Sequence, residues 1–371
     1  MNVPFFSFSN APRKLKSQWK KSLTNVVNKG IFIQGPEVKN FELAWAEKLK
    51  VKYSIGVSNG QDGLILALRA LGIGKGDYVA VPAHTFIAVH NAVLSVGAHP
   101  HSIDVDGSGL INIELLKKSE QKFKAIIVVH MHGQMVDMRE VSFWAKKLKV
   151  FVIEDCSQAH LALQDDVYAG AWGDVGVFSL YPTKNLGAFG DAGIIVTSDG
   201  ALATSIKHLS NYGSSPDDKY KHNTFGLNYR LDEIQASVLN LNLKYLVSWN
   251  LRRKEIADFY LKNLNLELIK PLNPNLDSSV WHHFCVLIEN RDVFKQQLSK
   301  LGITTDIHYP YLAAKEVEGF TNSIKTSYPL AENIARKTLS LPISPWHRDR
   351  EIRFVVDKIN FLLKKLSDEI K

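Results

Sequence analysis

Short aliphatic runs alternate with helical stretches along most of this chain, and this alternation limits its fold more than any other feature. KAIIVVHMHG (124–133), VFVIEDCS (150–157) and AGIIVTSD (192–199) are aliphatic runs bounded by turn residues. Helical stretches such as DMREVSFWAKKLK (137–149) separate several of them. Buried strands joined through helices are typical of parallel sheets. We therefore expect an α/β fold with a mainly parallel central sheet.

The length and the later part of the chain predict a second, smaller domain. A chain of 371 residues is longer than one ordinary core requires. The pattern is helical from about residue 205 to 262, and KPLNPNLDSS (270–279) then supplies prolines and turn residues. The remainder mixes strand and helix and ends in the amphipathic REIRFVVDKINFLLKKL (350–366). We predict a large α/β domain at 1–265, with an N-terminal arm, and a smaller α+β domain at 266–371.

Composition argues against membrane and nucleic-acid partners. Apolar residues make up 45% of the chain and charged residues 22%, as in ordinary globular proteins. The net charge of +8 is modest for this length, so a solvated surface is favoured over a nucleic-acid site. No aliphatic run approaches the roughly 20 residues of a membrane span, and the N-terminus does not resemble a signal peptide. Cys156 and Cys285 lie far apart in sequence, which favours the reducing cytoplasm.

One lysine and one aspartate carry the chemical prediction. Lys184 stands in SLYPTKNLGAFGDAG (179–193), after a strand, and Asp155 ends the strand of VIEDCSQAH (152–160). Taken singly, Asp155 suits a helix N-cap and Lys184 a solvated turn. Taken together, they suit pyridoxal phosphate at the carboxyl ends of the strands. The lysine would bond the aldehyde carbon, and the carboxylate would keep the ring nitrogen protonated.

The phosphate of such a cofactor needs backbone N–H groups. VSNGQDGLILALRA (57–70) predicts a strand, an Asn59-Gly60 turn and a helix whose N-terminus could bind an anion. A strand, turn and helix without any ligand is equally common, so this motif alone decides nothing.

Six ordered blocks resemble one family over nearly the whole chain, the pyridoxal phosphate-dependent nucleotide-sugar aminotransferases of the DegT/DnrJ/EryC1/StrS family. The blocks are GPEVKNFE (35–42), the long segment 56–88, VGAHPHSIDVD (96–106), VIEDCSQAH (152–160), FSLYPTKNLGAFGDAG (178–193) and GLNYRLDEIQASVL (226–239). The resemblance implies the fold type I, aspartate aminotransferase-like architecture. It also implies pyridoxal 5'-phosphate as cofactor and a homodimer with shared active sites.

The resemblance also assigns roles to single residues. Lys184 resembles the Schiff-base lysine, which also moves the proton between substrate and cofactor, and Asp155 resembles the partner of the ring nitrogen. Gln158 matches the residue that contacts the ring hydroxyl, and Phe86 matches the aromatic residue that stacks on the cofactor face. The phosphate-binding positions are matched by Gly60, Gln61 and Ser179. Asn228 matches an asparagine that reaches the phosphate from the other subunit.

Three positions depart from the commonest family pattern. Gln61 stands where many members have a hydroxyl residue, so its phosphate contact would come from the backbone. Leu161 replaces a usual glycine and Cys156 replaces a small residue, which affects local packing and leaves the chemistry intact.

The resemblance narrows the substrate to a keto sugar. Relatives with histidine in place of the lysine act as dehydratases, and Lys184 argues against that branch. KNLGAFGDAG (184–193) is similar to members that act on 3-keto sugars, with L-glutamate as amino donor. His308 and Tyr309 match a stretch beside the sugar in enzymes of dTDP-3-keto-6-deoxyhexoses, although an edge strand packed on the small domain is an equal alternative. His84 and Tyr181 are further candidates for the sugar pocket.

A UDP-3-keto-uronate is the main alternative substrate. An enzyme for that sugar would need a cation at the sugar carboxylate, and Arg230 could serve or could form a structural ion pair. A 4-keto sugar enzyme of the same family is a further alternative. We expect a dTDP-3-keto-6-deoxyhexose.

Three other classes compete with this reading. A non-catalytic regulator of the same fold is disfavoured because no DNA-binding segment is visible. An unrelated nucleotide-binding enzyme is disfavoured because no G-x-G-x-x-G follows the first strand. An enzyme acting on amino acids would need an arginine for the α-carboxylate near the C-terminus, for which there are four candidates, Arg336, Arg348, Arg350 and Arg353.

Overall fold

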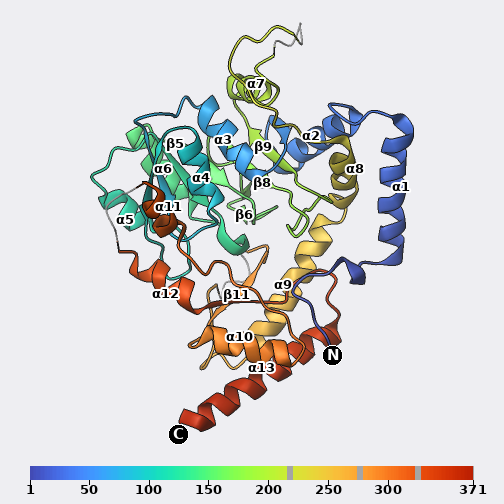
Figure 1. Ribbon diagram of the computed structural model, residues 1–371, viewed down its shortest axis with the longest axis vertical. Helices are drawn as coiled ribbons and strands as arrows, with labels where there is room; N and C mark the ends of the chain where they lie inside the picture. Colours follow the sequence, from blue (N-terminus) through green and yellow to red (C-terminus); the bar gives the residue numbers. More distant parts are fainter. Residues whose placement is uncertain (215–219, 274–278, 322–326, 371) are drawn as a thin grey trace.

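The computed structural model describes residues 1–214, 220–273, 279–321 and 327–370 (Figure 1). The strands are β1 Tyr53–Val57, β2 Tyr78–Pro82, β3 His99–Ile103, β4 Ala125–Val129, β5 Phe151–Asp155, β6 Leu163–Gln164, β7 Val167–Tyr168, β8 Val175–Ser179, β9 Gly193–Thr197, β10 Lys270–Pro271, β11 Phe284–Leu287 and β12 Thr338–Leu341. The predicted strand segments all contain an observed strand.

Helices alternate with these strands along much of the chain. They are α1 Arg13–Lys29, α2 Pro36–Leu49, α3 Gly60–Ala70, α4 Ala88–Ser95, α5 Ile113–Lys118, α6 Met138–Leu148, α7 Gly200–Leu209, α8 Glu233–Asn242, α9 Leu246–Asn263, α10 Arg291–Lys300, α11 Ala313–Thr321, α12 Pro329–Lys337 and α13 Asp349–Ile370. Two short 3-10 helices, η1 Phe8–Asn10 and η2 Met131–Gly133, complete the set among the described residues.

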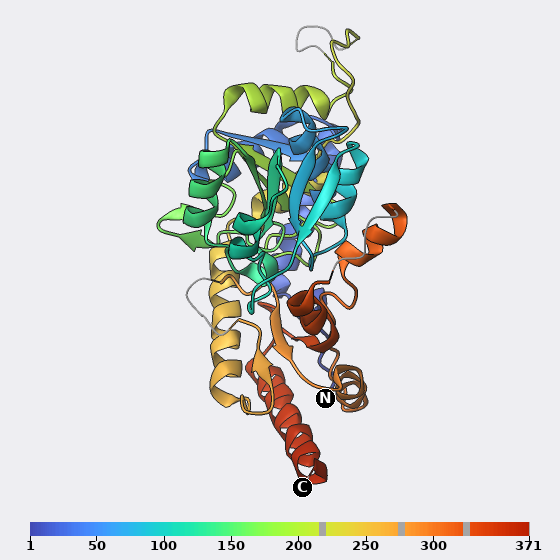
Figure 2. The same ribbon diagram turned by 90° about the vertical axis from the view of Figure 1, so that its left-hand side faces the viewer.

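The central sheet has seven strands in the order β1-β9-β8-β5-β4-β2-β3. Every pair from β8 to β3 is parallel, whereas β9 runs antiparallel to both of its neighbours. The mainly parallel sheet is thus confirmed. Helices cover both faces of the sheet, as Figure 2 shows. This explains why β4 and β9 are buried along their whole length.

A second core forms below the central sheet. It contains the three-stranded antiparallel sheet β10-β11-β12 and residues of α9, α10 and α13. The N-terminus joins it, because the Val3 N–H donates to the Gly302 carbonyl at 2.8 Å. In Figure 1 the long α9 runs from the central sheet into this lower part. The domain boundary at 265/266 stays a prediction, and residues 274–278 of the proposed crossing lie outside the described residues.

The helical pattern expected from 205 to 262 is interrupted. Helix α7 ends at Leu209, and residues 210–214 and 220–232 form turns and isolated bridges before α8 begins. Tyr212 and Gly213 have φ angles of 58° and 68°. A left-handed backbone conformation stops a helix, so the prediction was wrong for this segment.

Candidate active site

Three parallel strands bring the candidate residues to one edge of the sheet. Strands β1, β5 and β8 point the same way, and the segments after them carry Gly60, Asp155 and Lys184. Their carboxyl ends open on a cavity of about 560 Å³, a size suited to a small organic ligand. Ten of the predicted site residues line it: Gly60, Gln61, Phe86, Asp155, Gln158, Ser179, Tyr181, Lys184, His308 and Tyr309.

Lys184 lies in a tight turn that follows β8 in the sequence. Its N–H donates to the Tyr181 carbonyl at 2.9 Å, which closes the turn. Burial lowers the pKa of the Lys184 ammonium from 10.5 to about 8, and the Asp155 charge opposes this shift. Part of the residue remains accessible from the cavity. A shielded amine with a lowered pKa is a suitable nucleophile for an aldehyde.

Asp155 is the last residue of β5 and is nearly buried. Its Oδ1 accepts a hydrogen bond from the Ser157 N–H at 3.0 Å. No helix follows, so the helix-cap alternative is wrong, and the contact is a local turn. No hydrogen-bond donor among the described residues reaches Oδ2. That oxygen is therefore free to accept a hydrogen bond from a protonated ring nitrogen.

The N-terminus of α3 also borders the cavity. Asn59 caps it, since its Oδ1 accepts from the Asp62 N–H at 2.9 Å. The N–H groups of Gly60 and Gln61 have no acceptor in the described part of the chain, as expected for the first turn of a helix. A Cβ atom at Gly60 would lie 2.9 Å from Ser179 Cβ. Glycine thus lets the helix N-terminus lie close to the Ser179 hydroxyl, as a phosphate site requires.

Gln158, Phe86 and Tyr309 form one wall. The Gln158 Oε1 accepts from the His132 N–H at 2.7 Å, and its Nε2 donates to the Tyr309 hydroxyl at 3.2 Å. The Phe86 and Tyr309 rings lie 5.4 Å apart, and Phe86 keeps 53% of its surface exposed. The exposed aromatic face of Phe86 is therefore available to a flat ligand ring.

His308 and Tyr309 border the cavity and lie outside any strand. The edge-strand alternative is therefore wrong. His308 Nδ1 lies 2.8 Å from Ser340 Oγ, and burial lowers the pKa of His308 to about 4. His84 lies behind this wall: its Nε2 is 3.1 Å from the Tyr309 nitrogen and 3.0 Å from the Tyr309 carbonyl oxygen. His84 thus supports the cavity wall and does not line it.

Asn228 and Arg230 lie away from the Lys184 cavity of their own chain. Asn228 forms a backbone bridge with Asn211, and Arg230 Nη1 donates to Asn211 Oδ1 at 2.9 Å. The Arg230 guanidinium also lies 5.4 Å from the centre of the Tyr212 ring. Arg230 lines a different cavity, together with Lys39, Lys52 and Lys207. Arg230 makes no ion pair in the described residues.

Several cavity residues were not predicted from the sequence. They are Asn59, Asp62, Leu64, Thr85, Ala88, Val129, Ser157, Thr183, Asp191, His282 and His283. Asp62 stands two residues after Gly60 and could have been found from the helix-capping pattern. His282 and His283 come from the lower core, and no local pattern relates them to Lys184.

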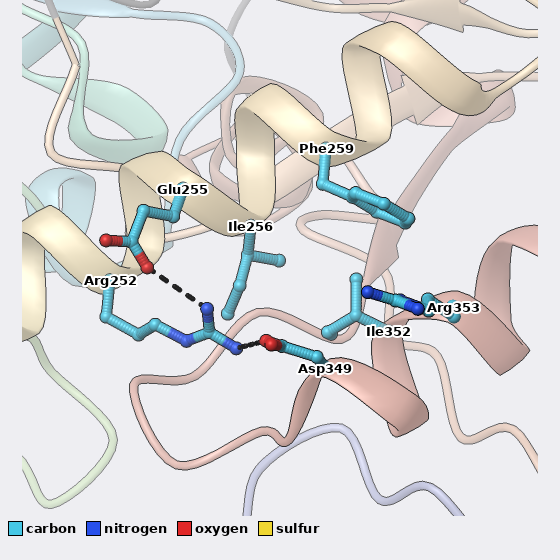
Figure 3. A pocket seen from close by; sticks show the side chains of 7 residues that line it. All are labelled: Arg252, Glu255, Ile256, Phe259, Asp349, Ile352 and Arg353. Carbon is cyan, nitrogen blue, oxygen red and sulfur yellow. Dashed lines mark hydrogen bonds and ion pairs between the residues drawn. The ribbon is translucent and has the colours of Figure 1, made fainter.

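A separate pocket between α9 and α13 contains one of the four C-terminal arginines. Figure 3 shows Arg353 at this pocket, next to Ile352, and Arg252 on the other side of it. The Arg252 guanidinium pairs with Glu255 and Asp349. Neither Arg353 nor Arg336, Arg348 or Arg350 lines the Lys184 cavity. This arrangement counts against an amino-acid enzyme that uses one of them for an α-carboxylate. The described helices also include none that is both long and apolar enough to cross a membrane.

Comparison with known proteins identifies the family. The DegT/DnrJ/EryC1/StrS aminotransferase family matches residues 13–360. A dTDP-3-amino-3,6-dideoxy-alpha-D-galactopyranose transaminase of Aneurinibacillus thermoaerophilus is 40% identical over 96% of this chain and 99% of its own length. A UDP-N-acetyl-3-dehydro-alpha-D-glucosamine 3-aminotransferase of Acidithiobacillus ferrooxidans is 37% identical, with 91% and 92% covered.

Solved structures agree with the sequence comparison. The crystal structure of S. venezuelae DesV in complex with a ketimine intermediate matches with a TM-score of 0.93 and 37% identity. The match covers 98% of this chain and 99% of that one. The predicted fold type, the aminotransferase activity and the pyridoxal phosphate dependence are confirmed, because the chain belongs to the DegT/DnrJ/EryC1/StrS aminotransferase family.

Proposed function

We propose that this enzyme transfers the amino group of L-glutamate to the C3 ketone of a dTDP-3-keto-6-deoxyhexose. The product is a dTDP-3-amino-3,6-dideoxyhexose. The observation that carries the proposal is the cavity in which Lys184 and Asp155 meet the α3 N-terminus and the His308-Tyr309 wall. We further propose that the reaction takes place in the cytoplasm.

The residues of the cavity suit pyridoxal phosphate. The Gly60 and Gln61 N–H groups, with the Ser179 hydroxyl, would hold the phosphate. Asp155 Oδ2 would accept the ring N–H, and Phe86 would pack on the ring. When bound, the cofactor supplies an electron sink that stabilises negative charge on the carbon that loses its proton.

Lys184 has two tasks in this proposal. Its amine would hold the cofactor in the resting enzyme and, when free, would move the proton that the substrate carbon gives up. A pKa of about 8 leaves a useful fraction of the amine unprotonated near neutral pH. The same side chain is therefore required when L-glutamate gives up its amine and when the sugar receives it.

We place the sugar at the part of the cavity that His308, Tyr309 and Tyr181 line, called the sugar end below. The residues there favour a neutral sugar. His308, Tyr309 and Tyr181 supply aromatic and polar surface, and no arginine lines the cavity within the described chain. Burial keeps His308 uncharged at neutral pH, since its pKa is about 4. Within one subunit, a uronate carboxylate would be buried here without an arginine to pair with it, which is costly. A 6-deoxyhexose avoids that cost.

The enzyme is proposed to act as a homodimer with shared active sites. In this arrangement Asn228 of one subunit would reach the cofactor phosphate of the other. Arg230 lies two residues further on and would approach the same site, so the UDP-3-keto-uronate remains the alternative substrate. The 4-keto sugars are the second alternative.

The reverse reaction tests the choice of sugar. Purified enzyme would receive 2-oxoglutarate with a dTDP-3-amino-3,6-dideoxyhexose, a UDP-3-amino-uronate or a dTDP-4-amino-4,6-dideoxyhexose. We expect kcat/KM for the first sugar to exceed the others at least about tenfold, a difference of roughly 1.4 kcal/mol in transition-state binding. A higher value for either of the other two would overturn the proposed substrate and leave the aminotransferase in place.

Mixed subunits test the shared site. Lys184→Ala and Asn228→Ala subunits would be co-expressed with different affinity tags, and only the mixed dimer would be purified. Each parent dimer should be impaired, whereas the mixed dimer contains one site with both native residues. Recovery toward half of the wild-type activity supports a site shared between subunits. A mixed dimer no better than its parents refutes it.

A further inference from the structure

Two histidines and a cysteine meet at the active-site cavity, which His283 lines, and none of them has a role in the proposed reaction. His132 lies in η2 after β4, His283 directly precedes β11, and Cys285 lies in β11. Their exposed fractions are 3%, 7% and 5%. His132 Nδ1 is 3.3 Å from His283 Nδ1 and 3.5 Å from Cys285 Sγ. All three potential ligand atoms lie within 4.8 Å of one another.

The separations of 3.3 Å and 3.5 Å match two edges of a tetrahedral zinc site. With Zn–N near 2.05 Å and Zn–S near 2.3 Å, two nitrogens lie about 3.3 Å apart and a nitrogen and a sulfur about 3.6 Å apart. Imidazole and thiolate together are also the ligand types that select Zn²⁺ over Mg²⁺ or Ca²⁺. We propose that His132, His283 and Cys285 bind a Zn²⁺ ion in this enzyme.

A second buried group of potential ligands, His130, Glu154 and Cys156, shows how protein partners can occupy such atoms. Glu154 accepts hydrogen bonds from the N–H groups of Gly170, Trp172 and Gly173 at 2.7–2.9 Å, and from His130 Nε2 at 3.0 Å. His130 Nδ1 also accepts from the Val136 N–H. These atoms are committed to protein partners, so that cluster has no lone pair directed at a cation.

The proposed ligand atoms differ because their polar contacts are largely with one another. The two Nδ1 atoms face each other, and the Cys285 Sγ faces one of them. Ser340 Oγ lies 3.2 Å from Sγ and is a candidate for a fourth ligand. Cys285 would bind the ion as a thiolate. Binding forms the Zn–S bond and releases the thiol proton to solvent.

The ion would join the two cores at the wall of the active site. His132 belongs to the segment after β4, whereas Cys285 lies in β11 of the lower sheet and His283 directly precedes that strand. The His283 ring stacks on His308, with centroids 3.8 Å apart and an interplanar angle of 16°. Zinc at this place therefore has a structural task, since it would fix the His308 ring that borders the sugar end of the cavity.

Metal analysis of the complete, cofactor-loaded enzyme tests the proposal. The protein would be purified without a polyhistidine tag and freed of loosely bound metal by gel filtration before its zinc content is measured. We expect one zinc ion per chain in the wild type and in Cys156→Ser, a control at the other buried cysteine. In Cys285→Ser the zinc content should fall at least about tenfold, because even changes outside the ligand set cost 10–100-fold in affinity.

Cobalt gives a readout that does not require the variant to fold. Wild-type enzyme from cells grown with Co²⁺ should show the visible absorption of a tetrahedral cobalt ion. It should also show a sulfur-to-cobalt charge-transfer band. Chelator treatment should also lower the unfolding temperature of the wild type more than that of Cys285→Ser. Wild-type enzyme with far less than one metal ion per chain and no tetrahedral cobalt spectrum would overturn the proposal.

Discussion

Lys184 should make the cofactor-free protein less stable than it would be with an apolar side chain. A fall in its pKa from 10.5 to about 8 corresponds to about 3 kcal/mol, because one pKa unit is worth about 1.4 kcal/mol. Part of the residue faces the cavity, where water moderates this cost. We therefore expect Lys184→Met to raise the free energy of unfolding by about 2–3 kcal/mol at neutral pH and to abolish transamination.

The pH dependence of this gain gives a sharper test. The unfolded chain holds the Lys184 proton up to a pKa of 10.5 and the folded chain only up to about 8. Stability of the wild type therefore rises as pH increases from about 8 to 10.5 and is lowest below that range. The advantage of Lys184→Met should shrink by about 1 kcal/mol between pH 7 and pH 9.

Urea unfolding of the cofactor-free proteins, followed by circular dichroism, measures both effects. Lys147→Met, at an exposed position of α6, is the matched control and should change stability by less than about 0.5 kcal/mol. Equal stability of Lys184→Met and wild type at neutral pH would refute the reasoning. So would a difference that stays constant up to pH 9.

Four further changes test other parts of the site and the fold. Asp155→Asn should slow the half-reaction with L-glutamate by about 10–1,000-fold in stopped-flow absorbance, since a carboxylate shifts a neighbouring cation by one to three pKa units. Gly60→Ala should lower the amount of cofactor retained after dialysis, because the new Cβ would lie 2.9 Å from Ser179 Cβ. Tyr309→Phe removes the acceptor of the Gln158 Nε2 donor and should cost about 1 kcal/mol in urea unfolding. Burial lowers the pKa of His90 from 6.5 to about 4, so stability falls as pH decreases through this range by up to about 3 kcal/mol, and His90→Gln should flatten the decline measured by urea unfolding.

The sheet and the cavity edge were predictable because their signals are local. Fully aliphatic runs such as 125–129 predict buried parallel strands, and β4 is buried throughout. Asp155 and Lys184 each follow a strand, so the rule that ligands bind beyond the carboxyl ends of strands placed both at one site. The helix-cap reading of Asp155 failed because Ser157 closes a turn there and no helix follows.

Contacts between segments that are distant in sequence could not be predicted from local sequence patterns. His84 carries no periodic signal, and its position behind Tyr309 depends on the packing of residues 225 positions apart. The meeting of His132 with His283 and Cys285 likewise depends on how η2 and β11 lie against each other. Residues 210–214 and 220–232 were predicted to be helical, and the prediction was wrong because helix propensity is a weak prior that tertiary contacts override.

A two-step half-reaction tests the central claim most directly. The enzyme is first converted with L-glutamate to its amine-loaded form and freed of excess donor, and dTDP-3-keto-6-deoxyhexose is then added. We predict that the cofactor absorbance of the resting enzyme returns promptly in the wild type, and that Lys184→Ala completes neither step. A clean first step without recovery would contradict the proposed sugar. Normal turnover by Lys184→Ala would contradict the assigned role of Lys184.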